Sequence, residues 1–150
     1  MVIAFCGHAD YTERINDEMK VLDFLETVLQ GKDVYFYLGE YGAFDAFAYK
    51  CAKRFKLKQP NAKLVFITPY LDFNHKCFSH IGDEFDEIIY PELEDVPLKF
   101  AISQRNKWIV NKSDLLICYI AHNYGGAYSM CTYAKKKNKK IYNIKTDMYL

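Results

Sequence analysis

The amino-acid sequence predicts an α/β domain of the Rossmann-like kind, in which helices flank a mainly parallel sheet in three layers. Short apolar runs that are typical of buried strands alternate with segments whose apolar residues recur every three or four positions, as in amphipathic helices. Strands separated by helices of this length join through right-handed crossovers, which make neighbouring strands parallel. A length of 150 residues is typical of one domain, so we expect residues 1–150 to form a single unit.

The first third of the chain predicts two strand–helix units, with strands at residues 1–6 and 34–38. Asp10 and Glu13 resemble a capping pair that would open the first helix, and Gly31 would close it. The residues expected in its buried stripe are Ile15, Met19, Leu22, Leu25 and Leu29. Those expected in the stripe of the second helix are Phe44, Phe47, Ala48, Cys51, Ala52 and Phe55.

The rest of the chain predicts four more strands and two more helices. The strands are expected at residues 64–68, 87–90, 114–120 and 141–144. Pro97 suits the first turn of a third helix that runs to about residue 111, and a fourth helix is expected to end near residue 137. The residues expected to face inward are Leu98, Ile102 and Ile109 in the third helix and Ala127, Cys131 and Ala134 in the fourth. Residues 71–84 have no clear period, so we expect a long functional or mobile loop there.

Composition limits the classes of function. The formal net charge is +1, which gives no overall field that favours nucleic acid, and the lysine-rich run at 135–140 is typical of a solvated helix end. The five scattered cysteines are typical of reduced structural thiols, and neither a signal peptide nor a membrane-spanning apolar run is present. We expect a cytoplasmic protein that does not contact membranes. His75, Cys77 and His80 lack the second half of a zinc site, so we expect no metal.

Three glycine-containing turns follow three of the predicted strands, at Gly7-His8, residues 39–45 and residues 124–129. None of them is a dinucleotide-binding fingerprint or a phosphate-binding P-loop. The carboxyl ends of parallel strands meet at one edge of the sheet, where open α/β sheets bind their ligands. The coincidence of the turns therefore predicts a ligand site at that edge. His8 and His122 end two of the strands and are expected to line the same cleft through packing or polar contacts.

The last of these turns is expected to hold a phosphate. Gly125 and Gly126 would open the fourth helix, whose free backbone N–H groups attract anions, and Ser129 would add a hydroxyl donor. Tyr128 is a candidate for stacking on a base. The alternative is a tight strand-to-helix turn without a ligand.

The middle turn is expected to contact a different part of the ligand. Gly39 and Gly42 allow close approach of the backbone, whereas Asp45 in the first helical turn would repel a phosphate. We therefore assign this turn to ribose hydroxyls or a base, with Asp45 accepting hydrogen bonds; a plain helix cap is the alternative. Glu40 is either a general acid or base or a solvated side chain, and Tyr41 is a second candidate for stacking on a base.

Arg105 falls on the stripe of the third helix that should be apolar, so its charge needs a partner. It would contact a bound phosphate or form an ion pair with a buried carboxylate such as Asp45 or Asp114, and the ion pair is our first expectation. Asn106 has the same two interpretations.

Five short motifs occur in order along the chain: Cys6-Gly7-His8, Gly39-Glu40-Tyr41-Gly42-Ala43-Phe44-Asp45, Arg105-Asn106, Ser113-Asp114-Leu115-Leu116-Ile117, and Gly125-Gly126-Ala127-Tyr128 followed by Tyr133-Ala134-Lys135-Lys136. Together they resemble the SLOG superfamily, which includes the Smf/DprA and LOG proteins, and most closely its small YpsA-like single-domain branch. The resemblance covers nearly the whole chain. It implies a Rossmann-like fold that binds a nucleotide or a nucleotide-derived ligand.

The chain departs from the enzymes and from the DNA-binding proteins that it resembles. LOG-type phosphoribohydrolases share a P-G-G-x-G-T-x-x-E motif whose Glu takes part in catalysis. Here Tyr124 replaces the Pro, Tyr128 replaces the third Gly and Thr132 replaces the Glu. Smf/DprA proteins bind single-stranded DNA through a similar core, but this chain lacks the basic balance of that role, so we expect no nucleic-acid ligand.

We therefore expect a binding or sensing domain for a nucleotide or nucleotide derivative, with no assigned cofactor and with a homo-oligomer as an open alternative to a monomer. A second hypothesis is an enzyme that hydrolyses or transfers at the glycosidic bond of a nucleotide, with Glu40 or Asp45 in place of the missing Glu. A third is a protein-interaction module that uses exposed tyrosines and the loop at residues 71–84.

Overall fold

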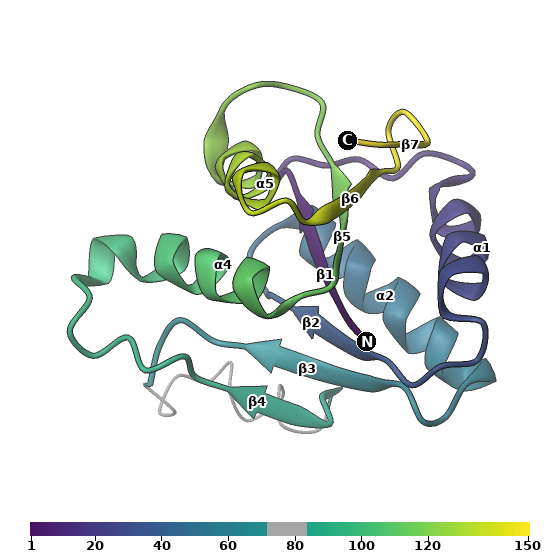
Figure 1. Cartoon of the computed structure of the whole chain (residues 1–150), viewed down its shortest axis with the longest axis horizontal. Helices are drawn as coiled ribbons and strands as arrows, with labels where there is room; N and C mark the ends of the chain where they lie inside the picture. The colour runs from purple at the N-terminus through teal and green to yellow at the C-terminus, as the bar shows by residue number, and fades with distance from the viewer. Residues whose placement is uncertain (72–83) are drawn as a thin grey trace.

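The computed structural model describes residues 1–71 and 84–150. They form one seven-stranded sheet in the order β4-β3-β2-β1-β5-β6-β7, parallel except for the last pair (Figure 1). The strands are β1 (Val2–Gly7), β2 (Tyr35–Leu38), β3 (Lys63–Ile67), β4 (Glu87–Ile89), β5 (Leu115–Tyr119), β6 (Lys140–Asn143) and β7 (Met148–Tyr149). The predicted α/β class with a mainly parallel sheet is confirmed, and β7 is a strand that the sequence pattern did not indicate.

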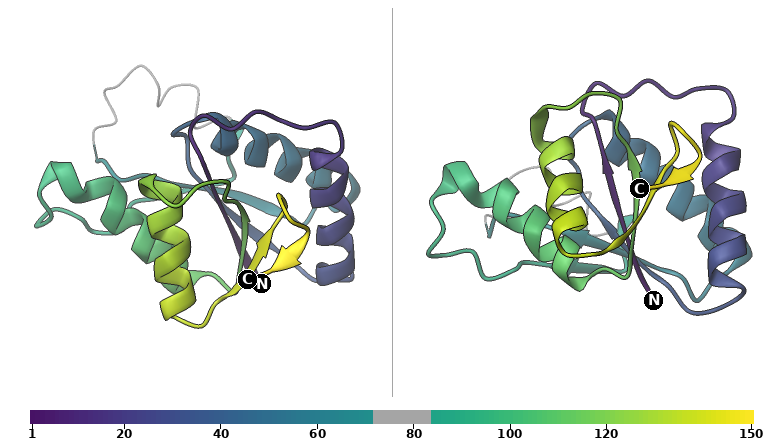
Figure 2. Two further views of the ribbon diagram at one scale, coloured as in Figure 1. Left: turned by 90° about the horizontal axis from the view of Figure 1, so that it is seen from above. Right: turned by 45° about the horizontal axis from the view of Figure 1, so that its top comes forward.

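Helices cover both faces of the sheet, as Figure 2 shows. They are α1 (Asp17–Leu29), α2 (Ala43–Lys58), α4 (Ala101–Lys112) and α5 (Gly125–Lys136), and a short 3-10 helix, η1 (Leu98–Phe100), precedes α4. The core between the sheet and α1 and α2 includes large rings such as Phe36, Phe44 and Phe66. The core under α4 and α5 includes smaller side chains such as Ala4 and Cys118. Among the described elements, α1 and α2 therefore pack against one face of the sheet, and α4 and α5 pack against the other.

The direction in which strands are added reverses at β1. The chain places β2, β3 and β4 in succession on one side of β1, and then crosses back to place β5 on its other side. In the register of these two strands, Cys6 lies beside Cys118 and Gly7 beside Tyr119. Such a reversal leaves a crevice outside the carboxyl ends of the two strands, where open α/β sheets bind ligands.

The first helix begins later than the capping prediction places it. Its N-cap is Asn16, and Ile15 and Met19 of the predicted buried stripe are 98% and 62% exposed. The preceding segment is an irregular connection in which buried Tyr11 donates a hydrogen bond to Asp17 at 2.7 Å. The hydrogen bond to Asp17 overrides the capping signal of Asp10 and Glu13, so that prediction is wrong. The buried stripe predicted for α2 is confirmed in full.

The third helix is also shorter than predicted. Leu98 lies in η1 and is 79% exposed, because α4 starts only at Ala101. The side of α4 that faces the core includes Ala101, Arg105 and Ile109, whereas Ile102 is 38% exposed. The inward placement of Leu98 and Ile102 is therefore wrong, and the buried placement of Arg105 is confirmed.

The loop predicted at residues 71–84 lies almost entirely outside the described residues, as do His75, Cys77 and His80. Within the described part of the chain, no three His, Cys, Asp or Glu side chains are grouped closely enough to hold a metal ion. The helices of that part are too short or too polar to cross a membrane. The described cysteines are buried free thiols, namely Cys6, Cys51, Cys118 and Cys131.

Candidate functional site

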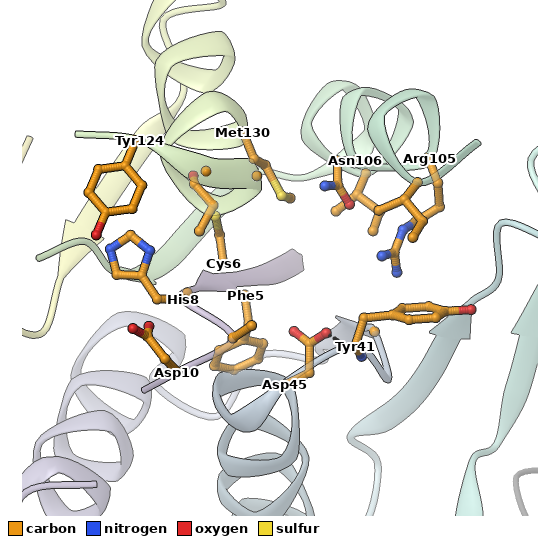
Figure 3. A pocket seen from close by; sticks show the side chains of 18 of the residues that line it. Phe5, Cys6, His8, Asp10, Tyr41, Asp45, Arg105, Asn106, Tyr124 and Met130 are labelled. Atoms are coloured by element: carbon orange, nitrogen blue, oxygen red, sulfur yellow. Dashed lines mark hydrogen bonds between the residues drawn. The ribbon is translucent and has the colours of Figure 1, made fainter. Parts of the chain in front are cut away.

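A cleft of about 350 Å³ lies at the carboxyl edge of the sheet, in the crevice that the reversal at β1 leaves (Figure 3). The turns after β1 and β2 and the first turn of α2 contribute to it from one side, and α4 and the first turn of α5 from the other. Nine of the predicted ligand-binding residues line this cleft: Gly7, His8, Gly39, Tyr41, Asp45, Arg105, Asn106, Gly125 and Gly126. The structure thus brings together most of the residues that the sequence singled out.

Four of the predicted residues do not line the cleft. Glu40 is exposed, and Tyr128 projects from α5 with 37% of its surface exposed. Gly42 is needed for the backbone conformation of the turn, because its φ is +121° and a Cβ there would lie 2.7 Å from the Cα of Ala9. Ser129 lines a neighbouring groove.

Arg105 of α4 and Asp45 of α2 point toward one another across Gly39, as Figure 3 shows. A Cβ at Gly39 would lie 2.8 Å from Nη1 of the arginine and 2.8 Å from Oδ2 of the aspartate. Only glycine leaves room for both side chains at this point. The two charges come from helices on opposite faces of the sheet and meet at the edge of the sheet.

Arg105 is only 4% exposed, yet it has no carboxylate within ion-pair distance among the described residues. Its Nη1 donates to the carbonyl oxygen of Ile67 at 3.0 Å, and its guanidinium lies 5.2 Å from the ring centre of Tyr41. Its Nε is buried and lacks a hydrogen-bond partner in the described part of the chain. Burial lowers the pKa of Arg105, while the facing carboxylate of Asp45 opposes that shift. The guanidinium is therefore a desolvated cation that is incompletely satisfied.

Within the described residues, Arg105 does not form the ion pair that was expected with Asp45 or Asp114. Asp114 accepts a hydrogen bond from the backbone N–H of Val2 at 2.7 Å, which places it at the amino ends of the strands, the opposite edge of the sheet. Asp45 faces the arginine but uses Oδ2 to accept the N–H of Tyr41 at 2.8 Å. Burial raises the pKa of Asp45, although the Tyr41 hydrogen bond and Arg105 act in the other direction. Asp45 thus closes the turn between β2 and α2.

The start of α5 opens into the cleft. Gly125 has a φ of +89°, a conformation that favours glycine, and no side chain caps the helix at Tyr124. A Cβ at Gly126 would meet no atom within 4 Å, so the space above the first turn is open. Cys6 donates a hydrogen bond from Sγ to the carbonyl oxygen of Ala127 at 3.1 Å and ties this turn to β1. The backbone N–H groups of the first turn are thus without a side-chain cap, as an anion site requires.

Stacked rings form a further wall of the cleft. His8 and His122 stack with their ring centres 3.5 Å apart, and His122 stacks on Tyr124 at 3.9 Å. Nε2 of His8 accepts the N–H of Ala121 at 2.9 Å, so that nitrogen carries no proton. Burial, with a smaller effect from His122, lowers the pKa of His8 and favours this neutral form. The polar contact expected for His8 is therefore structural, because it holds the loop after β5 in place through Ala121.

Sequence reasoning did not select several residues that line the cleft. They are Phe5, Cys6, Ala9, Asp10, Ile102, Ile109, Tyr124, Ala127 and Met130. Tyr124 and Ala127 already lie within the predicted turn at residues 124–129, although no contact was assigned to them. Widening the turn at Gly7-His8 by two positions would have added Phe5, Cys6, Ala9 and Asp10. Ile102 and Met130 depend on how α4 packs beside α5, and no local pattern carries that information. Thr132, which replaces the Glu of the LOG motif, does not line the cleft.

No protein-family model matches the sequence, and no curated protein matches it significantly. Solved structures share the fold. DNA processing protein A (DprA) from Streptococcus pneumoniae has a TM-score of 0.63 and 16% identity, over 94% of this chain and 49% of that chain. DprA from Helicobacter pylori, described with a single-stranded DNA binding mode, has a TM-score of 0.63 and 18% identity, over 95% of this chain and 64% of that chain.

A molybdenum cofactor binding protein from Rippkaea orientalis has a TM-score of 0.59 and 19% identity, over 95% of this chain and 74% of that chain. This chain thus spans about half of the pneumococcal protein and somewhat less than two thirds of the Helicobacter protein. At these identities the likeness concerns the fold. It agrees with the resemblance to Smf/DprA proteins, while the YpsA-like branch stays a prediction.

Proposed function

We propose that this domain binds a nucleotide or a nucleotide derivative in the cleft at the carboxyl edge of the sheet. The observation that carries the proposal is Arg105, a buried cation without a carboxylate partner among the described residues and with an unsatisfied Nε. A desolvated charge of this kind is costly unless an anionic or polar ligand completes its contacts. The uncapped first turn of α5 supports the same class of ligand.

Each part of the ligand has a proposed contact. The phosphate lies at Gly125 and Gly126, and the sugar or base lies between Asp45 and Arg105, where one group donates to the carboxylate and another accepts from the guanidinium. Tyr41 stacks on the base. The resemblance to SLOG proteins supports a nucleotide as the ligand class, and two structural relatives are described as binding single-stranded DNA or the molybdenum cofactor.

A thermal-shift screen against nucleoside monophosphates, cyclic nucleotides, ADP-ribose and NAD tests the proposal. Mass action predicts a stabilisation of about 2.7 kcal/mol at a ligand concentration one hundred times the Kd. Gly126→Asp, which places a carboxylate over the α5 start, is expected to abolish the shift. Ala46→Asp adds the same charge at an exposed position of α2 outside the cleft and is expected to retain it. A folded protein that responds to no nucleotide would contradict the proposal and favour a protein-interaction module.

A second candidate function is cleavage or transfer at the glycosidic bond of the bound nucleotide. One observation favours Asp45 over Glu40 for this chemistry: Asp45 lines the cleft, whereas Glu40 lies outside it. Burial raises the pKa of both carboxyl groups, so the position in the cleft decides between them. Incubation with the nucleotide that binds, followed by chromatography for free base, separates the two functions. Release of base that Asp45→Asn abolishes and Glu40→Gln retains would establish the enzyme.

A further inference from the structure

A second groove of about 330 Å³ adjoins the cleft and runs between α4 and α5. The two hollows share four lining residues, namely Ile102, Asn106, Gly126 and Met130. A ligand whose phosphate lies at Gly126 therefore stands at the border between them. A mononucleotide in the cleft would leave the second groove unfilled.

The groove is basic. Its charged lining residues are Lys99 and Lys107, and Ser103 and Ser129 add hydroxyl donors. Neither lysine belongs to an ion pair of the described residues, and α4 and α5 contain no Asp or Glu. In residues 96–146 the sole acidic residue is Asp114, at the other edge of the sheet, against ten lysines and arginines. The positive potential of this groove is thus not neutralised from within these elements.

Aromatic rings, and not carboxylates, contact these lysines. Nζ of Lys107 lies 5.7 Å from the ring centre of Tyr133, and Nζ of Lys99 lies 5.0 Å from that of Phe100. The hydroxyl of Tyr133 donates to Asn111 at 3.1 Å, which fixes the ring against α4. Cation–π contacts leave the ammonium groups free to bind an anion, because no carboxylate competes for them.

We propose that this groove is a second anionic subsite, which binds a second phosphate of the ligand held in the cleft. The inference rests on the proposed function, because it takes the first phosphate to lie at Gly126. The ligand class is then a nucleotide extended through its phosphate, either by a pyrophosphate link, as in a dinucleotide, or by a phosphodiester link, as in a short oligonucleotide. Ile102 and Met130 line the passage from one subsite to the other.

Calorimetric titration tests this inference in two steps. The four nucleoside monophosphates identify the preferred base, and that base is then presented in a pyrophosphate-linked dinucleotide and in a 5′-phosphorylated dinucleotide. At least one of the extended ligands is expected to bind about tenfold more tightly than the monophosphate, which corresponds to about 1.4 kcal/mol. The ligand that shows this higher affinity identifies the kind of link, a pyrophosphate or a phosphodiester.

Charge reversal in the groove supplies the decisive comparison. The double variant Lys99→Glu with Lys107→Glu is expected to lose the tenfold gain and to keep the affinity for the monophosphate. The matched control is Lys112→Glu with Lys136→Glu, which lie on α4 and α5 beside the groove but outside both hollows, and it is expected to retain the gain. Circular dichroism checks that both variants fold.

The outcomes separate the two proposals. If a monophosphate binds and neither extended ligand gains affinity, the second subsite is wrong and the proposed function stands. If both double variants lose the tenfold gain in affinity equally, the gain comes from the overall positive charge of the protein, and the proposed second subsite is wrong. If no monophosphate and no extended ligand binds, the proposed function is wrong and the subsite falls with it.

Discussion

The two faces of this sheet use charge in different ways. On the side of α1 and α2, most of the basic side chains that contact another side chain are paired with carboxylates: Lys50 contacts Glu13 at 2.6 Å, and Arg54 contacts Glu18 at 2.8 Å. Lys53, which lies beside the ring of Tyr49, is an exception. Every ion pair of the described residues uses a cation from residues 14–58.

On the side of α4 and α5, no cation forms an ion pair with a carboxylate of the described residues. Arg105 is buried, and Lys99 and Lys107 lie beside aromatic rings. Lys139 donates to backbone carbonyl oxygens.

This difference distinguishes charges that support the fold from charges that remain available to a ligand. The net charge of +1 is a sum over both faces and conceals their opposite character. The composition argument against nucleic acid therefore applies to the molecule as a whole and not to the face that carries the cleft. If the comparison holds, substitutions on the α1/α2 face should change stability, and those on the α4/α5 face should change binding.

The largest expected effect tests the core of the α1/α2 face. Phe44 is fully buried and packs against Gly7, where a Cβ would lie 2.1 Å from its ring. We expect Phe44→Ala to lower the free energy of unfolding by about 4 kcal/mol and Met130→Ala, on the cleft side, by about 2 kcal/mol. Urea denaturation measures both. Equal losses would show that the two faces contribute alike to stability.

The next effect compares two carboxylates. Burial alone would raise the pKa of Asp17, but hydrogen bonds from Arg14 and Tyr11 outweigh it and hold the pKa below its usual value. We expect Asp17→Asn to cost about 2 kcal/mol at neutral pH, because it removes a buried carboxylate that accepts hydrogen bonds from Tyr11 and the half-exposed Arg14. Asp45→Asn should slightly raise stability, since burial disfavours the charged form and the amide oxygen can still accept the N–H of Tyr41. Both carboxylates belong to the α1/α2 face, so a gain for Asp17→Asn and a loss for Asp45→Asn would contradict this account of what each one contributes.

Arg105→Met should change stability little, by less than about 1 kcal/mol, because the lost hydrogen bond to Ile67 is offset by removal of a desolvated charge. Arg14 is the matched case on the other face, where its guanidinium contacts Asp17 at 2.9 Å. We expect Arg14→Met to cost more than Arg105→Met, since it leaves a buried carboxylate behind. Denaturation curves at neutral pH give the loss of unfolding free energy in each variant. A larger loss in Arg105→Met than in Arg14→Met would contradict this account.

The smallest effect concerns pH. The pKa of His8 is lowered from 6.5 by burial and by His122, so the unfolded chain takes up the proton more readily. The contribution of His8 to stability is therefore present above pH 6.5 and is lost as the pH falls through the folded-state pKa. We expect His8→Asn to flatten the decline of unfolding free energy between about pH 7 and about pH 5, and His122→Asn to flatten it less. An unchanged slope in His8→Asn would exclude this role.

Local patterns predicted the strands and the stripe of α2 because periodicity alone determines which residues are buried there. They failed at the start of α1, where Tyr11 and Arg14 bind Asp17, and that contact depends on the tertiary fold. Arg105 was detectable as a charge on an apolar stripe. That it does not form an ion pair with Asp45 depends on how the two side chains are placed across Gly39, which no local pattern specifies. The groove between α4 and α5 follows from the packing of two helices, and no motif in the sequence marks it.

The most direct test of the central claim is a calorimetric titration of the wild-type protein and of Arg105→Met with the four nucleoside monophosphates. We predict saturable binding of at least one of them by the wild type and its loss in the variant, with the fold of the variant verified by its denaturation curve. Absence of binding by the wild type, or equal affinity in both proteins, would contradict the claim that a bound nucleotide completes the contacts of this buried arginine.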